Sequence, residues 1–254
     1  HHLANGRYLQ RQPEEVVNEI AAVAEDHIYF VDDEMFVNAR RAEAIARLLL
    51  ERGIRKRYIS WARSDTICRH PDLFRLWKSA GLEVVYVGLE SLESRTLADY
   101  NKGYEPDTNL KAIGILRDVG IILHAALMVN PDFEARDFLR LRKSLEHIAP
   151  AEVSFTVFSP PPGTPLWDRH KDQFIVKDPC AFYDCMHTIL PTRLPLKVFY
   201  RYFALLYLFG FRQNPWRQRR IKAPFRDLVR MFGAGVRCGH ALRTLYRDYD
   251  EALW

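Results

Sequence analysis

The amino-acid sequence predicts an α/β fold in which parallel strands alternate with helices. Short apolar runs rich in β-branched and aromatic residues recur roughly every 25 to 40 residues, and segments with helical apolar spacing separate them. The runs are almost continuously apolar, as in parallel strands that are covered on both faces. They span residues 27–31, 57–62, 83–89, 121–129 and 152–158. This alternation predicts an α/β barrel or an open α/β sheet.

Helices are expected between these runs. Residues 39–53 carry apolar side chains on one face, and Gly53 can cap the C-terminus of that helix. Residues 70–81 and 105–120 have the same spacing and also end in glycine. In both α/β architectures, ligands bind at the C-terminal ends of the strands. The residues that follow each apolar run are therefore the candidate site.

The alternation predicts one domain over residues 1–170 and a helical C-terminal extension over residues 171–254. The chain of 254 residues carries a net charge of +5. Residues 212–254 hold ten Lys and Arg against four Asp and Glu, which is +6, so a basic tail follows a body whose net charge is about zero. Such a tail can meet anionic lipid or nucleic acid, or it can be a solvated helical face.

The composition favours a cytoplasmic protein. The cysteines are too few and too scattered for a secreted disulfide framework, and their spacing matches no zinc or cluster pattern, so we expect simple thiols and no metal site. No apolar run reaches the roughly 18 to 20 residues of a membrane-spanning helix. The four cysteines are Cys68, Cys180, Cys185 and Cys238.

Several motifs, taken in order, resemble the radical S-adenosylmethionine (SAM) superfamily. They are NGRYLQRQPEEVVNEI before the first run, FVDDEMFVN at its end, VYVGLESLESRTLADYNKGY across the third run, and SPPPGTPLW after the last. Each motif alone occurs by chance, but the ordered set is specific. Within the superfamily the sequence is most similar to the cobalamin-binding class, and DCMHTILPTRLPLKVFY is similar to members that methylate or remodel hopanoids and related lipids. The resemblance implies a partial (β/α)6 TIM-like barrel that lacks its first strand.

The acids after the first run are the leading candidates for cofactor binding. The resemblance implies that Asp32 and Asp33, and then Glu34, accept hydrogen bonds from the α-ammonium of SAM. Carboxylates suit this role because they accept charge-assisted hydrogen bonds from an ammonium group. The alternative interpretation is that these acids cap the helix that follows.

The ends of the second and third runs supply further candidates. Gly88 has no side chain and can let a ligand approach the backbone, and the resemblance places Glu90 and Ser91 near the ribose or carboxylate of SAM. Arg63 can hold a carboxylate of SAM or of the substrate. Alternatively, it neutralises Glu90 and Asp65.

The last candidates come from the fourth and fifth runs. His124 shares a face with Met128 on the fourth run, so it can contact SAM or substrate, or it can be a satisfied core residue. Asn130, which ends that run, can reach the adenosine. The turn that contains Pro162, Gly163 and Thr164 is expected to be rigid, with positive φ at Gly163 and a helix cap at Thr164, and the resemblance places it over the adenine.

The resemblance also implies a reaction. In the intact parent, a reduced 4Fe-4S cluster would cleave SAM to a 5′-deoxyadenosyl radical, which abstracts hydrogen from an unactivated carbon, and cobalamin would then deliver a methyl group. The cluster needs cysteines spaced CxxxCxxC, and the chain has no such triplet. We expect the triplet and a cobalamin domain to lie upstream of His1, which would leave this chain inactive by itself. No residue is assigned as catalytic.

Other functions stay open. The parent can be a non-methylating relative such as an oxidative cyclase, or the chain can be a catalytically inert truncated binding module. The expected partner is a small-molecule or lipid substrate rather than nucleic acid. The pattern of residues 198–211 predicts an aromatic helix, and the basic stretch RQNPWRQRRIK follows it. We therefore expect residues 198–230 to touch a membrane surface peripherally. The alternative is that this helix packs on the barrel.

Overall fold

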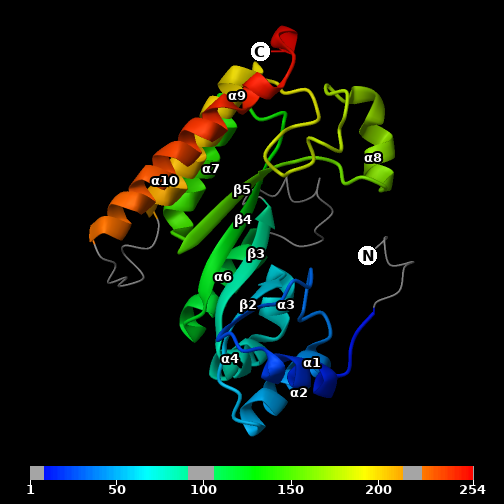
Figure 1. The fold of residues 1–254 in the computed structure, drawn as a ribbon, viewed down its shortest axis with the longest axis vertical. Coiled ribbons are helices and arrows are strands. Elements are labelled where there is room, and N and C mark those ends of the chain that lie inside the picture. Colours follow the sequence, from blue (N-terminus) through cyan, green and yellow to red (C-terminus); the bar gives the residue numbers. More distant parts are fainter. Residues whose placement is uncertain (1–8, 91–105, 214–224, 254) are drawn as a thin grey trace. The chain divides into compact units, whose positions relative to one another are not determined.

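The computed structural model describes residues 9–90, 106–213 and 225–253 (Figure 1). The chain divides into two compact units, residues 1–125 and residues 126–254, and the division falls inside the fourth strand. Each unit is described by itself below. The predicted domain boundary near residue 170 stays a prediction.

A parallel half-barrel sheet carries the fold, which confirms the predicted α/β class. Its strands follow one another in space in the order of the chain, as expected when a helical crossover connects each parallel pair. The strands are β1 (His27–Tyr29), β2 (Arg57–Ala62), β3 (Leu82–Glu90), β4 (Ile122–Val129) and β5 (Glu152–Val157).

The first strand is shorter than the sequence predicts. The expected run extends to Val31, but β1 ends at Tyr29, although the Phe30 amide still donates to the Ile59 carbonyl at 2.9 Å. β1 lies at the edge of the sheet, where β2 supplies its described ladder. With a neighbour on one side only, the chain turns away early, and Val31 is 80% exposed.

Three helices of the first unit lie at the predicted segments 39–53, 70–81 and 105–120, whereas two others, over residues 13–22 and 64–69, were not predicted. The three predicted helices end at the glycines expected to cap them: Gly53, Gly81 and Gly120 have φ values of +66°, +117° and +78°. Asn38 caps the N-terminus of the helix that follows the acidic run, because its side chain accepts a hydrogen bond from the Arg41 amide at 3.1 Å. The helices are α1 (Pro13–Ala22), α2 (Ala39–Glu51), α3 (Ser64–Arg69), α4 (Pro71–Ala80) and α6 (Pro106–Val119).

Trp77 of α4 lies at the centre of the first unit's core. Its side chain is fully buried, and its indole N–H donates to the Ala42 carbonyl of α2 at 3.0 Å. Its ring meets those of Phe30, Phe36 and Tyr58 edge-on at 5.7 to 5.9 Å. This tryptophan therefore joins α2 and α4 to β2 and to the segment that follows β1.

Gly81 connects α4 to β3 in a space that excludes a side chain. A Cβ atom added there would lie 2.0 Å from the carbonyl oxygen of Lys56, which precedes β2. The Gly81 carbonyl accepts a hydrogen bond from the Tyr58 amide at 3.0 Å. The backbone at residue 81 thus packs directly on the backbone that enters β2.

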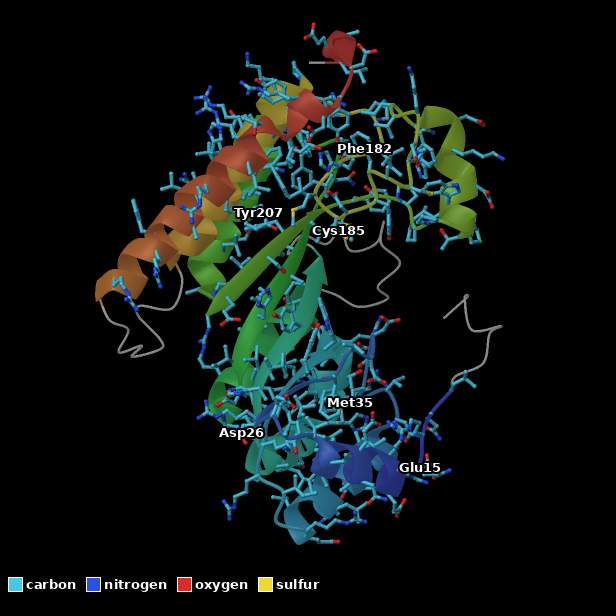
Figure 2. The ribbon with its side chains drawn as sticks, in the orientation of Figure 1. Glu15, Asp26, Met35, Phe182, Cys185 and Tyr207 are labelled. Atoms are coloured by element: carbon cyan, nitrogen blue, oxygen red, sulfur yellow. The ribbon has the colours of Figure 1, made fainter. Side chains whose placement is uncertain are left out.

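The second unit is mainly helical (Figure 2). The predicted helix over residues 198–211 lies within α9, which packs on β5, α7 and α10. Gly210 of α9 meets Val153 and Phe155 of β5, so the helix approaches the strand closely. No helix in the described part of the chain is long and apolar enough to cross a bilayer. The helices are α7 (Ala135–Ile148), α8 (Pro165–His170), α9 (Leu196–Gln213) and α10 (Phe225–Thr244), with short turns η1 (Lys171–Gln173), η2 (Leu245–Asp248) and η3 (Glu251–Leu253).

Candidate functional site

The three acids after β1 have different surroundings. Asp32 and Asp33 are exposed, whereas the side chain of Glu34 is only 7% exposed. Glu34 accepts a hydrogen bond from the Arg63 amide at 3.3 Å. The alternative in which these acids cap the next helix is wrong, because Asn38 caps α2. Two carboxylates therefore remain accessible at the C-terminal end of the strand, and the third is held inside.

Arg63 is paired at the neighbouring strand end. Its guanidinium lies 3.7 Å from the Glu34 carboxylate and donates to Asp65 at 2.9 Å, and Asp65 also pairs with Arg69 at 2.8 Å. Partial burial raises the pKa of the Asp65 carboxyl, but hydrogen bonds and charges from Arg63 and Arg69 outweigh burial and hold that pKa below its ordinary value. The predicted neutralisation of Asp65 is confirmed, and the side chain of Glu90 lies outside the described residues.

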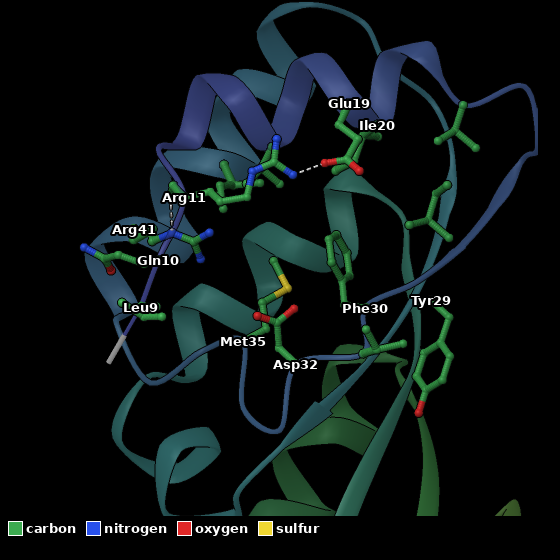
Figure 3. Close-up of a pocket in the computed structure, with 15 residues that line it drawn as sticks. Leu9, Gln10, Arg11, Glu19, Ile20, Tyr29, Phe30, Asp32, Met35 and Arg41 are labelled. Atoms are coloured by element: carbon green, nitrogen blue, oxygen red, sulfur yellow. Dashed lines mark hydrogen bonds and ion pairs between the residues drawn. The ribbon is translucent and has the colours of Figure 1, made fainter. Parts of the chain in front are cut away.

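A cavity of about 500 Å³ lies beside the end of β1 (Figure 3). Asp32 lines it, as do Arg41 of α2 and apolar side chains of α1 such as Val16 and Ile20. Arg41 is oriented by the hydrogen bond from its Nε to the Arg11 carbonyl at 2.8 Å. A mostly apolar wall with a few placed charges is typical of a small-molecule site. Arg41 has no distinctive signal in the sequence, because a cation in the first turn of an amphipathic helix is usually a solvated residue.

The end of β3 is fixed by a buried polar pair. Asn109 of α6 is fully buried, donates to the Leu89 carbonyl at 3.2 Å and accepts a hydrogen bond from Ser64 at 2.6 Å. Gly88 lies just before this anchored position, while Ser91 lies outside the described residues. Asn109 therefore positions the strand end that carries the predicted site, and sequence alone missed it because an asparagine in a helix has no recognisable spacing.

Asn109→Ala is expected to lower the free energy of unfolding by about 2 kcal/mol, because the Ser64 hydroxyl and the Leu89 carbonyl would lose a buried partner. Urea unfolding measures the loss. Asn18→Ala is the matched control, since Asn18 is an exposed asparagine that accepts a hydrogen bond from Arg52, and it should change stability by less than about 0.5 kcal/mol. Equal effects in the two variants would contradict the positioning role.

Rings from neighbouring strands form a row on one face of the sheet. Trp61 of β2 is paired in register with Tyr86 of β3, with ring centroids 4.9 Å apart. Tyr86 stacks on His124 of β4 at 3.9 Å, and Tyr29 of β1 lies 5.9 Å from Tyr86. The predicted alternation of β4 is confirmed, because His124 and Met128 are half-buried whereas their neighbours are buried. This aromatic row lies on the face of the sheet that carries His124.

The turn after β5 in the second unit has the predicted geometry. Gly163 has φ +75°. The Thr164 hydroxyl donates to the Pro161 carbonyl at 2.7 Å and accepts from the Trp167 amide at 3.3 Å, so it caps α8. Asn130 is half-buried at the end of β4, and its carbonyl accepts from the Phe133 amide at 3.0 Å. The local shape at Pro162, Gly163 and Thr164 is thus as expected, and their contact with adenine stays a prediction.

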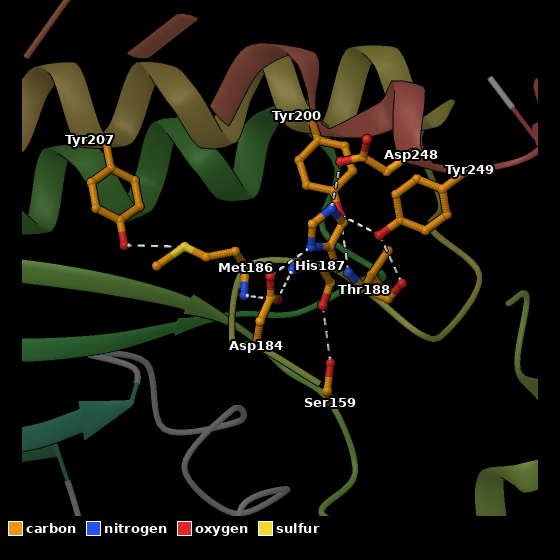
Figure 4. Close-up of polar contacts among 9 residues, drawn as sticks. All are labelled: Ser159, Asp184, Met186, His187, Thr188, Tyr200, Tyr207, Asp248 and Tyr249. Carbon is orange, nitrogen blue, oxygen red and sulfur yellow. Dashed lines mark hydrogen bonds and ion pairs between the residues drawn. The ribbon is translucent and has the colours of Figure 1, made fainter. Parts of the chain in front are cut away.

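A second polar cluster, centred on His187, joins the chain before α9 to the C-terminal turn (Figure 4). His187 bonds Asp184 through Nδ1 at 2.8 Å and Asp248 through Nε2 at 3.0 Å. Partial burial raises the pKa of the Asp184 carboxyl, but hydrogen bonds donated by His187 and by the Met186 amide outweigh it and lower that pKa. Nearby, the buried hydroxyls of Tyr200 and Tyr249 bond each other. The cluster ties distant segments together, and no local pattern in the sequence indicates it.

Comparison with known proteins adds the last observations. The model of the radical SAM superfamily matches residues 2–145. The chain is 30% identical over 247 residues to hopanoid C-3 methylase of Methylococcus capsulatus, which covers 97% of this chain and 45% of that protein. It is 26% identical over 179 residues to anaerobic magnesium-protoporphyrin IX monomethyl ester cyclase of Cereibacter sphaeroides, which covers 67% of this chain and 29% of that protein. The chain thus spans less than half the length of these relatives.

Solved structures share the fold. One is the radical S-adenosylmethionine methyltransferase TsrM from Kitasatospora setae with cobalamin and a 4Fe-4S cluster bound, which aligns with a TM-score of 0.54 at 18% identity. The alignment covers 70% of this chain and 33% of that one. At this level of identity the similarity concerns the arrangement of strands and helices.

Proposed function

Since this chain belongs to the radical SAM superfamily, we propose that it works in an enzyme that cleaves S-adenosylmethionine and, with cobalamin, methylates an unactivated carbon of a lipid such as a hopanoid. The observation that carries the proposal is the 30% identity to a hopanoid C-3 methylase along nearly the whole chain. The accessible carboxylates at the end of β1 support it, because parallel α/β folds bind their ligands at this end of the strands.

The residues present fit an amino-acid-bearing nucleotide. Asp32 and Asp33 would accept hydrogen bonds from its ammonium group, and the Glu34 pair with Arg63 would keep the acidic turn in place. In the same proposal, Glu90 and Ser91 hold the ribose or carboxylate, and Gly163 and Thr164 lie near adenine. S-adenosylmethionine, when bound, supplies the deoxyadenosyl and methyl groups of the reaction. The protein's part is to bind and orient this molecule.

The described residues do not fit a 4Fe-4S cluster. Cys180, Cys185 and Cys238 are exposed and Cys68 is half-buried, and no group of three or more His, Cys, Asp or Glu in the described chain could hold a metal. An iron–sulfur cluster needs thiolates gathered around it. We therefore assign no cluster or cobalamin ligand to these residues and derive no step through either group.

A second function is favoured by one observation. The magnesium-protoporphyrin IX monomethyl ester cyclase of Cereibacter sphaeroides is also similar to this chain. We keep a non-methylating reaction, such as an oxidative cyclisation, as the alternative. The two differ in the fate of the methyl group: a methylase moves it to the product, whereas a cyclase does not.

One experiment separates these functions. The enzyme in which this chain works, reconstituted anaerobically with iron, sulfide and cobalamin, is incubated with a pentacyclic triterpene lipid and SAM labelled with carbon-14 in the methyl group. We expect label in the lipid together with 5′-deoxyadenosine. Deoxyadenosine without labelled lipid would favour the non-methylating function. Absence of both products, with no binding of SAM in equilibrium dialysis, would overturn the proposal in favour of an inert module.

The carboxylates after β1 provide a test in the same protein. Replacing both Asp32 and Asp33 by asparagine should weaken SAM binding by about 10- to 100-fold, since charge-assisted hydrogen bonds to an ammonium group would be lost. Equilibrium dialysis measures the affinity. Asp72→Asn with Asp118→Asn is the matched control, because these acids lie exposed on helices of the same unit, and it should leave the affinity unchanged. A similar loss in both variants would contradict the assigned site.

A further inference from the structure

Helices α9 and α10 pack as an antiparallel hairpin, in which Lys197 lies over the ring of Tyr246 and Leu208 meets Gly239. Both helices carry exposed side chains at helical spacing along their solvent side. We call this solvent-facing surface of α9, α10 and η2 the amphipathic face, and it has a basic half and an apolar half. The basic half consists of Lys197, Arg201, His240, Arg243 and Arg247, and the apolar half consists of Leu205, Leu208, Phe232 and Val236.

The antiparallel arrangement sorts the two kinds of side chain. Along α9, the cations Lys197 and Arg201 come first and Leu205 and Leu208 follow. On the same face of α10 and η2 the order is reversed: Phe232 and Val236 come first, and His240, Arg243 and Arg247 follow. The exposed Arg226, Arg230 and Arg237 are spaced onto other sides of α10. On the amphipathic face, cations of both helices therefore gather toward one end of the hairpin, and apolar side chains gather toward the other. Antiparallel packing places the like halves of the two helices together.

The basic half surrounds a cavity of about 390 Å³. Its lining in the described chain contains cations, a histidine, Val198, Thr244 and Tyr246, but no carboxylate. A hydrogen bond from Arg247, together with the charges of Arg247, Lys197 and Arg243, lowers the pKa of the Tyr246 hydroxyl. The same positive field that stabilises a phenolate would attract any other anion.

The nearby acids leave this charge largely uncompensated. Asp248 follows Arg247 in the chain, but its carboxylate bonds Nε2 of His187 at 3.0 Å. Among the described residues, none of the basic-half cations forms an ion pair with a carboxylate within 4.0 Å. Some other cations of the second unit do form ion pairs, such as Arg193 with Glu134 at 2.8 Å. The basic half is therefore available to an external anion.

The apolar half exposes side chains that globular surfaces usually cover. Phe232 is 71% exposed, Val236 53%, Leu205 50% and Leu208 43%. Leu139 of α7, 53% exposed, extends the apolar surface on the far side of α9, where it lines a groove with Leu205. Figure 1 shows α7, α9 and α10 side by side. A contiguous apolar patch rimmed by charge marks an interaction site.

We propose that the amphipathic face binds the surface of an anionic phospholipid membrane, with the apolar half in the acyl boundary and the basic half on the phosphates. Charge complementarity selects this partner, because lipid phosphates are anions that lie directly above an apolar layer. Nucleic acid would satisfy the cations but would leave Phe232 and its neighbours in water. The inference does not depend on the methylation proposed above, since it concerns surface residues remote in sequence from the predicted SAM ligands.

Co-sedimentation of the full chain with vesicles tests the inference. Vesicles of equal parts phosphatidylglycerol and phosphatidylcholine should bind the protein, and pure phosphatidylcholine should bind it at least about tenfold more weakly. The triple variant R201Q/R243Q/R247Q should lose at least about tenfold in partition onto the anionic vesicles, since each cation contributes roughly fivefold. The double variant L205S/F232S should lose about three- to tenfold, because the buried apolar area is reduced.

Matched controls remove charge or apolar area from the first unit. They are R40Q/R55Q/R117Q and L50S/L110S, whose side chains are exposed on that unit, and they should bind like the unmodified chain. Unfolding midpoints within about 2 °C would show that all variants fold. Equal binding to the two vesicle types, or face variants that bind like their controls, would overturn the inference. So would a triple variant that loses affinity for a DNA duplex while vesicle binding is unchanged.

Discussion

Trp77→Ala is expected to lower the free energy of unfolding of the first unit by about 4 kcal/mol. Truncation of a fully buried tryptophan removes apolar burial and leaves a cavity, which typically costs about 3 to 5 kcal/mol. Three aromatic rings would lose their central neighbour, and the Ala42 carbonyl would lose its donor. Urea unfolding followed by far-ultraviolet circular dichroism measures the change.

Trp77→Phe separates the two contributions. Phenylalanine keeps an aromatic ring in the space but removes the indole N–H, so its cost should be about half of that of alanine or less. An alanine variant that loses less than about 1 kcal/mol would show that the surrounding rings collapse into the space. In that case Trp77 would not be the residue that joins α2 and α4 to the strands.

Gly81→Ala is expected to cost about 3 kcal/mol or more. The φ of +117° is unfavourable for any residue with a Cβ atom, and that atom would lie 2.0 Å from the Lys56 carbonyl oxygen. Because the obstacle is backbone rather than a flexible side chain, relief requires β2 or β3 to shift. Thermal and urea unfolding should both show the loss.

Gly53→Ala is the matched control for this prediction. Gly53 also has a positive φ, +66°, but an added Cβ atom would have no neighbour within 4 Å. Its substitution should therefore cost only the conformational penalty, about 1 to 2 kcal/mol. The difference between the two variants isolates the close approach at Gly81, and equal costs would contradict it.

Much of the fold follows from local patterns in the sequence. The runs that became β2 to β5 lie within a residue or two of their predicted bounds, because buried parallel strands are continuously apolar. The glycine caps at Gly53, Gly81 and Gly120 follow from the steric freedom of glycine at positive φ. The end of β1 was misplaced because edge position is a property of the sheet, which no local pattern encodes.

The candidate site, like the fold, could be predicted from the sequence only in part. The acids at the strand ends could be predicted as site residues, because ligands of parallel α/β sheets bind at the C-terminal ends of the strands. The different surroundings of Asp32 and Glu34 could not be predicted, because they depend on Arg63, which comes from another strand. Asn109 and His187 also act through partners that are distant in sequence. Pairings of this kind emerge only when the chain is folded.

The row of rings formed by Tyr29, Trp61, Tyr86 and His124 has a consequence for selectivity. Such side chains have few rotatable bonds, and here each ring already rests against another, so little conformational entropy remains to be lost when a flat molecule settles on them. The affinity for such a ligand would then depend mainly on the planarity and apolar area of the ligand. Polar groups at the strand ends would need only to set its orientation.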